Sequence, residues 1–189
     1  TRCSDFVPVA WELPFGNGEK IPAYRIDLED GRALELSGRI DRVDMAEDKE
    51  NGKFWFRIID YKSGDLTLDP VDIYAGLRLQ LLVYLQIVLA NACILTGCDS
   101  AEPAIGGIYY SRVSDSLEKG EDDDRVPDLK LTGITLRDEK AVLLADREVN
   151  GYSQLIPMGM GNKGLYSRGG LEKEDFEFLQ QHLTELLKE

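Results

Sequence analysis

Two short stretches near the middle of the chain hold residues that could do chemistry together. The first is Gly-Arg-Ile-Asp-Arg-Val-Asp at 38–44, with a carboxylate at Asp41, and the second is Ile-Asp-Tyr-Lys-Ser at 59–63, with Asp60 and Lys62. Two carboxylates on one surface can hold a hydrated Mg²⁺ ion, and a nearby ammonium group can orient or deprotonate an attacking water or neutralise charge on a phosphate. This combination is typical of phosphodiester hydrolysis. The alternative is an ordinary Asp–Lys ion pair on an exposed sheet face, which stabilises a fold very little.

The spacing of the two stretches indicates that their side chains share one face of a β-hairpin. Asn51-Gly52 is a favoured two-residue hairpin turn. With that turn, Asp41 stands directly opposite Lys62 and diagonal to Asp60. A turn longer by two residues would change the partners but not the face, because side chains alternate with a period of two along a strand. All three are therefore expected on one face, with Asp44 on the other.

A long helix is expected to follow at 71–96, because apolar residues recur there at helical spacing and Gly97 stands where a C-cap glycine belongs. It is apolar on most sides and should lie buried against the sheet. Gln80 and Tyr84 are four residues apart and share one helix face. Beside the Asp60–Lys62 strand end, an amide and a phenol can bond phosphate or base edges, although a buried helix with one polar residue is the alternative. The residues expected to anchor this helix are Leu77, Leu81, Leu85 and Val88.

The rest of the sequence predicts one α/β or α+β domain built around a single sheet. Residues 114–127 are typical of an exposed acidic loop. We expect 1–189 to form a single domain, with a core at 24–110 and a helical part at 127–189. Strand patterns lie at 24–28, 33–45, 54–61 and 105–110, and further helix patterns lie at 138–150 and 173–189.

The composition limits the partners that the chain can have. With 35 acidic and 22 basic residues the net charge is −13, so any contact with nucleic acid needs a local basic patch or the charge of a partner. No segment approaches the ~20 apolar residues that cross a membrane. The three scattered cysteines, Cys3, Cys93 and Cys98, argue against disulfides and zinc, and Cys93 and Cys98 are expected to be core thiols. His182 is expected at the surface. Because the sequence opens at Thr1, we expect it to be part of a longer protein.

Together with Leu-Gln-Leu-Leu-Val-Tyr-Leu at 79–85, the two acidic stretches resemble the PD-(D/E)xK nuclease superfamily, and its RecB-like branch in particular. Within that branch the chain is similar to nuclease domains of the AddB type, found in ATP-dependent helicase/nuclease complexes. Weaker matches follow at 107–110, 129–136 and 176–179, so the resemblance runs from about residue 35 to the end. It implies an α/β restriction-endonuclease-like fold, with a central mixed β-sheet flanked by helices.

The resemblance also implies roles for individual residues. Asp41 and Asp60 would bind Mg²⁺, or alternatively Mn²⁺, and Tyr61 would belong to the same metal site. Lys62 would be the catalytic lysine. Full-length family members carry a [4Fe–4S] cluster as well, but the cysteines here do not match its spacing, and no cluster is expected in this chain.

The partners implied by the resemblance are DNA, contacted or supported at Gln80 and Tyr84, and a helicase/nuclease subunit of the same complex. The expected function is a Mg²⁺-dependent DNA exonuclease domain that acts in double-strand-break repair and recombination in the bacterial cytoplasm. Two alternatives stay open. One is a catalytically silent, nuclease-like module for DNA binding or assembly, and the other is a stand-alone nuclease of the Cas4 type.

Overall fold

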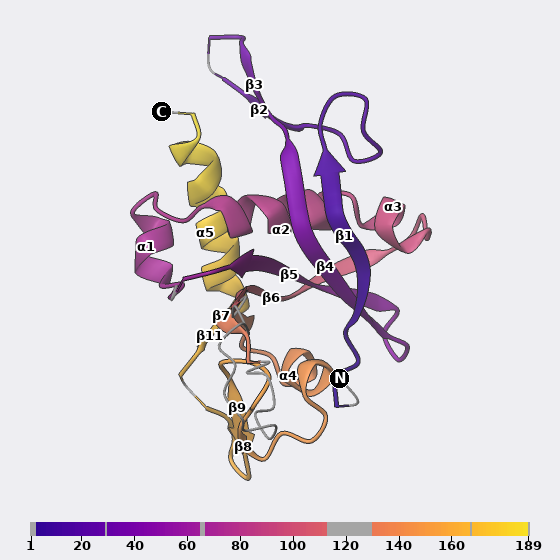
Figure 1. Ribbon diagram of the computed structural model, residues 1–189, viewed down its shortest axis with the longest axis vertical. Helices are drawn as coiled ribbons and strands as arrows, with labels where there is room; N and C mark the ends of the chain where they lie inside the picture. Colours follow the sequence, from indigo (N-terminus) through magenta and orange to yellow (C-terminus); the bar gives the residue numbers. More distant parts are fainter. Residues whose placement is uncertain (1–2, 29, 65–66, 113–129, 167, 189) are drawn as a thin grey trace, which may run out of the picture.

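The computed structural model describes residues 3–28, 30–64, 67–112, 130–166 and 168–188 (Figure 1). Its strands are β1 (Val7–Phe15), β2 (Tyr24–Asp27), β3 (Ala33–Leu36), β4 (Gly38–Asp48), β5 (Lys53–Lys62), β6 (Glu102–Arg112), β7 (Thr132–Leu136), β8 (Gly151–Tyr152), β9 (Gly159–Gly161), β10 (Gly164–Leu165) and β11 (Gly170–Leu171). Its helices are α1 (Pro70–Tyr74), α2 (Gln80–Ala90), α3 (Ala92–Thr96), α4 (Glu139–Ala145) and α5 (Lys173–Leu186).

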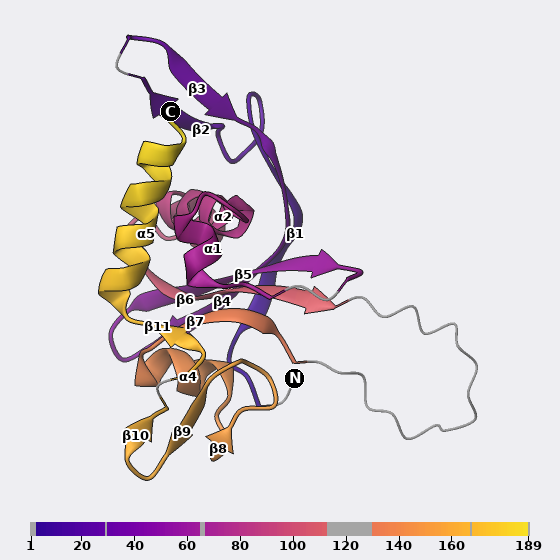
Figure 2. The ribbon, with the colours of Figure 1, turned by 90° about the vertical axis from the view of Figure 1, so that its left-hand side faces the viewer.

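A six-stranded mixed sheet forms the centre of the fold, in the order β1-β4-β5-β6-β7-β11. The pairs β5–β6 and β7–β11 are parallel, and the other neighbours are antiparallel. Helix α2 packs on β5 and β6, whereas α4 packs on β6 and β7 from the opposite side (Figure 2). The expectation of an α/β fold with a central mixed sheet flanked by helices is therefore confirmed.

The turn between β4 and β5 is longer than the sequence predicts. Asp48 pairs with Lys53, so four residues and not two connect the strands. The Asp48 carboxylate accepts bonds from the Glu50 N–H and the Asn51 side chain, and Gly52 closes the turn at φ 68°. The register therefore shifts by two residues, and the prediction that Asp41 faces Lys62 is wrong. A shift of two leaves every side chain on the face expected for it.

The expected strand at 33–45 is two strands that belong to different sheets. β3 pairs with β2 in a two-stranded hairpin that extends away from the central sheet, and β4 starts a new strand at Gly38 (Figures 1 and 2). A Cβ on Gly38 would lie 3.0 Å from the ring of Phe15, so a glycine lets that ring pack across the start of β4.

The expected helix at 71–96 is broken into α1, α2 and α3. Gly76 and Arg78 adopt positive φ angles of 79° and 55°, which an α-helix cannot contain. Seven of the eleven α2 residues are buried, as expected for a helix covered by the sheet, and Gly97 ends α3 in the left-handed conformation. Leu77 lies in the break and is 57% exposed, so the prediction that it anchors the helix is wrong.

The part expected to be helical, 127–189, holds β7 and four short strands as well as α4 and α5. Helix α4 stops at Ala145, because the Asp146 carboxylate turns to accept bonds from Ser153 Oγ and the Glu148 N–H. The acidic loop expected at 114–127 lies outside the described residues.

Two further expectations concern the surface. Cys93 is exposed on α3 and Cys98 is half-buried, so the prediction that both are core thiols is wrong. His182 lies on α5 with its ring stacked on Tyr74, the ring centres 4.6 Å apart. Among the described helices, none has the length and apolar content to span a membrane.

Candidate active site

The candidate site lies where β4 and β5 run side by side, at the end of β5 that leads toward α1 (Figure 1). On β4, Asp41 Oδ2 accepts a hydrogen bond from the main-chain N–H of Tyr61 at 2.9 Å. On β5, Asp60 Oδ2 lies 2.7 Å from Lys62 Nζ. The structure thus brings together the two carboxylates and the ammonium group that the sequence singled out.

Asp60 is the buried member of this group, with 2% of its surface exposed. Burial raises the pKa of Asp60 above its ordinary value, and the neighbouring Asp41 raises it further, while Lys62 acts in the opposite direction. Within the described residues, no well-directed hydrogen bond reaches Asp60 Oδ2, although Lys62 lies at ion-pair distance. The carboxylate is held where its negative charge is incompletely compensated, and a bound cation would relieve this.

Lys62 is half-buried beside that carboxylate. Its contact with Asp60 raises the pKa of the Lys62 ammonium group above its usual value. The side chain is therefore a cation at neutral pH, which suits it to stabilising negative charge and not to removing a proton.

Helix α2 adds a polar pair to the site. Gln80 Nε2 donates a hydrogen bond to Tyr84 Oη at 2.7 Å, as their spacing on one helix face predicts. Burial raises the pKa of Tyr84, and the charges of Asp60 and Asp41 raise it further, so this hydroxyl lies close to both carboxylates and stays protonated. The ring of Phe15 packs edge-on against Tyr84 at 5.9 Å and fixes its position.

Tyr110 is a member of the site that the sequence analysis missed. A bulge in β6 at Gly106 shifts its register against β5, so that Asp60 pairs with Tyr110. Without that bulge, Tyr109 would take this place. Burial raises the pKa of Tyr110, and Asp60 raises it further, which shows that the two groups are near one another. The Gly106-Gly107 pair inside a strand was the available signal, since glycines there often mark bulges.

A pocket of about 290 Å³ opens beside Lys62. It lies between the end of β5, the end of β6 and the start of β7, and its lining combines two cationic side chains with hydroxyl groups. The lining residues are Lys62, Gly64, Thr67, Tyr110, Ser111, Arg112 and Thr132.

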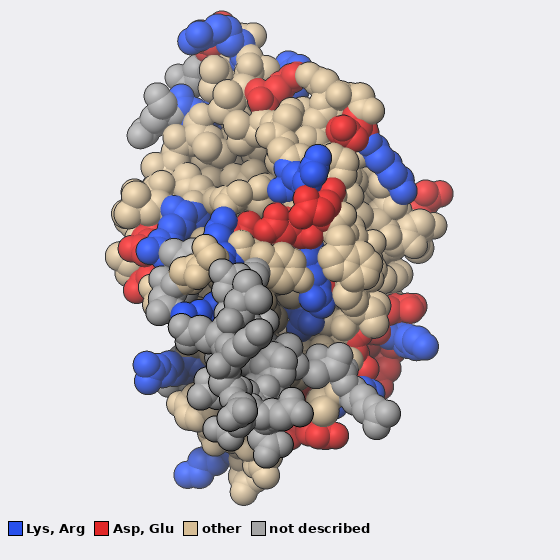
Figure 3. Space-filling model, viewed as in Figure 1, with Lys and Arg blue, Asp and Glu red and all other residues tan. Residues whose placement is uncertain are grey.

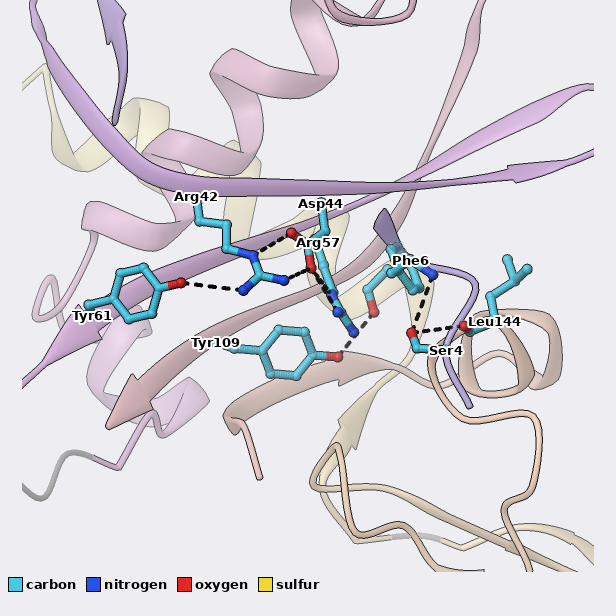
Figure 4. A network of polar contacts seen from close by, with 9 residues as sticks. Ser4, Phe6, Arg42, Asp44, Arg57, Tyr61, Tyr109 and Leu144 are labelled. Atoms are coloured by element: carbon cyan, nitrogen blue, oxygen red, sulfur yellow. Dashed lines mark hydrogen bonds and ion pairs between the residues drawn. The ribbon is translucent and has the colours of Figure 1, made fainter. Parts of the chain in front are cut away.

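Asp44 takes part in a separate network away from the carboxylate pair (Figure 4). It is fully buried, and it accepts two bonds from Arg42, at 2.6 and 2.9 Å, and two from Arg57, at 2.9 and 2.7 Å. Arg42 Nη1 also lies 3.3 Å from Tyr61 Oη. Tyr61 therefore joins the two sides, because its side chain contacts Arg42 and its main-chain N–H binds Asp41.

The residues at the site fit a hydrated hard cation. Among the described residues no group of three or more His, Cys, Asp or Glu side chains could hold a metal. A metal here would bind Asp41 and Asp60 and would take its other ligands from water and main-chain oxygen. Mg²⁺ commonly binds proteins through one or two carboxylates and keeps several waters. The uncompensated Oδ2 of Asp60 is the observation that favours such an ion.

Carboxylates from two adjacent strands, with a lysine two residues after the second of them, define a nuclease class when they lie on a mixed sheet of this kind. A family model described as the PD-(D/E)XK nuclease superfamily matches residues 1–189, and the chain belongs to that superfamily.

Curated relatives with a more specific name are similar to almost the whole chain. All are the B-type subunit of an ATP-dependent helicase/deoxyribonuclease. The relative from Clostridium novyi is 36% identical over 193 residues, covering 97% of this chain and 17% of the relative. That from Pelotomaculum thermopropionicum is 39% identical over 194 residues, covering 97% and 16%. That from Anoxybacillus flavithermus is 39% identical over 195 residues, covering 97% and 17%. The chain therefore spans about one sixth of the length of these relatives.

Proposed function

We propose that this chain is a Mg²⁺-dependent DNA exonuclease domain that hydrolyses phosphodiester bonds. The observation that carries the proposal is the meeting of Asp41, Asp60 and Lys62, with the Asp60 carboxylate buried and incompletely compensated. Membership of the PD-(D/E)XK superfamily supports it.

The metal-binding groups in this proposal are the carboxylates of Asp41 and Asp60 and the main chain at Tyr61. When bound, Mg²⁺ or Mn²⁺ would polarise the phosphate and lower the pKa of a bound water. The N–H of Tyr61 holds the Asp41 carboxylate in place through its 2.9 Å bond, so this ligand is oriented before any metal arrives.

Lys62 and Tyr84 would act on the phosphate directly. The Lys62 ammonium group stays protonated because Asp60 raises its pKa, and it would neutralise negative charge that develops on the phosphate oxygens. Tyr84 accepts a bond from Gln80 and still has its own proton to donate, so it would position a phosphate oxygen or a base edge. Gln80 would hold the Tyr84 hydroxyl in that orientation.

We further propose that the domain works within a helicase–nuclease complex in double-strand-break repair and recombination in the bacterial cytoplasm. The relatives are named as one subunit of an ATP-dependent helicase/deoxyribonuclease, which supports this, as does the small share of each relative that the chain covers. A net charge of −13 fits a domain that receives DNA from a partner and does not capture it alone.

The test compares DNA cleavage with ATP hydrolysis in a complete complex that carries this domain. Asp60→Ala and Lys62→Ala should each abolish DNA cleavage and leave ATP hydrolysis unchanged. Lys53→Ala is the matched control, since Lys53 lies at the opposite end of the same strand and pairs with Glu102 at the surface. Loss of both activities would indicate a disrupted assembly. An unaltered complex that binds DNA and hydrolyses ATP but never cleaves would support a silent module instead.

A further inference from the structure

Two exposed aromatic side chains flank an arginine beside the candidate site. Trp11 on β1 is 61% exposed and Tyr61 on β5 is 38% exposed. Arg42 on β4 lies between their strands, because it is the cross-strand partner of Trp11 and its guanidinium group contacts Tyr61 Oη. We call these three residues the aromatic row. Exposed large aromatic side chains are unfavourable in water, so their grouping calls for an explanation.

The aromatic row is held rigidly by the network beneath it. Arg42 binds Asp44 through two parallel hydrogen bonds, and Asp44 is in turn bound by Arg57 (Figure 4). Arg57 is itself packed over the ring of Phe6, 4.7 Å from its centre. A guanidinium group fixed in this way loses little further freedom when a ligand binds against it.

The local charge of the aromatic row differs from that of the whole chain. Asp44 is the shared partner of Arg42 and Arg57, so this buried group carries one net positive charge. On the adjoining surface Glu12 is paired with Arg39. Figure 3 shows acidic and basic side chains next to one another across the middle of this face. A polyanion can therefore approach here although the chain carries a net charge of −13.

The aromatic row also adjoins the catalytic groups along the chain. Tyr61 stands between Asp60 and Lys62, and its N–H binds Asp41. A strand of nucleic acid that crosses the site would pass this row within the length of a few nucleotides.

We propose that the aromatic row binds single-stranded nucleic acid next to the cleavage site, with bases stacked on Trp11 and Tyr61 and a phosphate near Arg42. This rests on the proposed nuclease function and adds the form of its substrate. Flat exposed rings stack on base faces, which are available in a single strand and covered in a duplex. Such stacking tolerates any base sequence.

The two tryptophans of the chain make the proposal directly measurable. Trp55 is only 7% exposed, and within the described residues its Nε1 has no hydrogen-bond partner, so Trp55→Phe removes no bond. In that variant Trp11 is the single source of tryptophan fluorescence. Titration with oligo(dT) in EDTA, where no metal-dependent cleavage occurs, should quench this fluorescence. An abasic oligonucleotide of the same length carries the same charge and should quench it far less.

Substitution of Trp11 then measures its part in binding. Trp11→Ala should weaken oligo(dT) affinity about 10-fold, within the range found for one stacked base, and should change affinity for the abasic strand little. Trp11→Phe should retain most of the affinity, because it keeps a flat ring. Phe178→Ala is the matched control, since Phe178 is similarly exposed on α5 outside the site, and it should bind like the parent chain.

Absence of quenching, or equal quenching by the two oligonucleotides, would overturn the proposal. So would an unchanged affinity in Trp11→Ala. These results are separable from failure of the nuclease function. Normal Mg²⁺-dependent cleavage with unchanged binding in Trp11→Ala would leave the nuclease and remove the stacking site. Base-dependent binding through Trp11 without cleavage would leave the stacking site and remove the nuclease.

Discussion

Gln80 and Leu81 are neighbours on α2 with different expected roles, so alanine substitutions at the two positions separate site from scaffold. Leu81 is 0% exposed, and Leu81→Ala should lower the free energy of unfolding by about 2–5 kcal/mol through the cavity it leaves. Gln80 is exposed, and its bond to Tyr84 is a neutral one at 2.7 Å. Gln80→Ala should therefore cost about 0.5–1.5 kcal/mol.

Two measurements on the same protein samples test this contrast. Urea unfolding followed by circular dichroism gives the free energy of unfolding, and single-turnover cleavage of a labelled oligonucleotide in Mg²⁺ gives the rate per folded molecule. Gln80→Ala should slow cleavage, because Tyr84 loses the group that orients its hydroxyl. Leu81→Ala should cleave normally in proportion to its folded fraction. Gln181→Ala, at an exposed position on α5, should change neither quantity.

The opposite pattern would refute the reasoning. If Gln80→Ala destabilises the chain more than Leu81→Ala does, and its folded fraction cleaves at the parent rate, then Gln80 is a structural bridge. The catalytic site would then consist of Asp41, Asp60 and Lys62 without a contribution from α2.

Three further outcomes are expected. Asp44→Asn should lower the free energy of unfolding by about 3–5 kcal/mol, since it leaves two buried or half-buried arginines without their shared partner, whereas Asp27→Asn in an exposed pair should cost about 0–1 kcal/mol in the same urea titration. Because burial raises the pKa of Asp60, its ionisation destabilises the fold as pH rises through the raised value; metal-free Asp60→Asn should therefore gain thermal stability over the parent chain as pH rises from about 3.5 to 7, and a gain confined to low pH would contradict this. The purified chain should show neither stoichiometric iron or zinc by elemental analysis nor the broad absorption near about 400 nm of a cluster, because three separated cysteines cannot supply four ligands.

The parts of the site that follow from side-chain alternation and helical spacing could be predicted from sequence. Asp41 and Asp60 meet although the predicted hairpin register is wrong, because an error of two residues preserves the face. The Gln80–Tyr84 bond follows from a spacing of four on a helix. These predictions depend on local geometry that holds in any context.

Features that depend on individual side chains or distant packing could not be predicted. The length of the hairpin turn is set by the Asp48 carboxylate, and the break before α2 depends on a positive φ at Arg78 that no periodicity reveals. The place of Tyr110 beside Asp60 follows from a bulge whose effect depends on the neighbouring strand. The aromatic row likewise joins residues from three strands, so the sequence alone gives no sign of it.

Cleavage of a labelled single-stranded oligonucleotide as a function of Mg²⁺ concentration tests the central claim most directly. The parent chain should cleave with Mg²⁺ and be inactive in EDTA. Asp60→Asn should stay folded and be slower by on the order of 100-fold or more at every Mg²⁺ concentration, since charge stabilisation worth several kcal/mol is lost with the ligand. Cleavage by Asp60→Asn at a rate close to that of the parent chain, with the same Mg²⁺ dependence, would show that the metal site and the chemistry lie elsewhere.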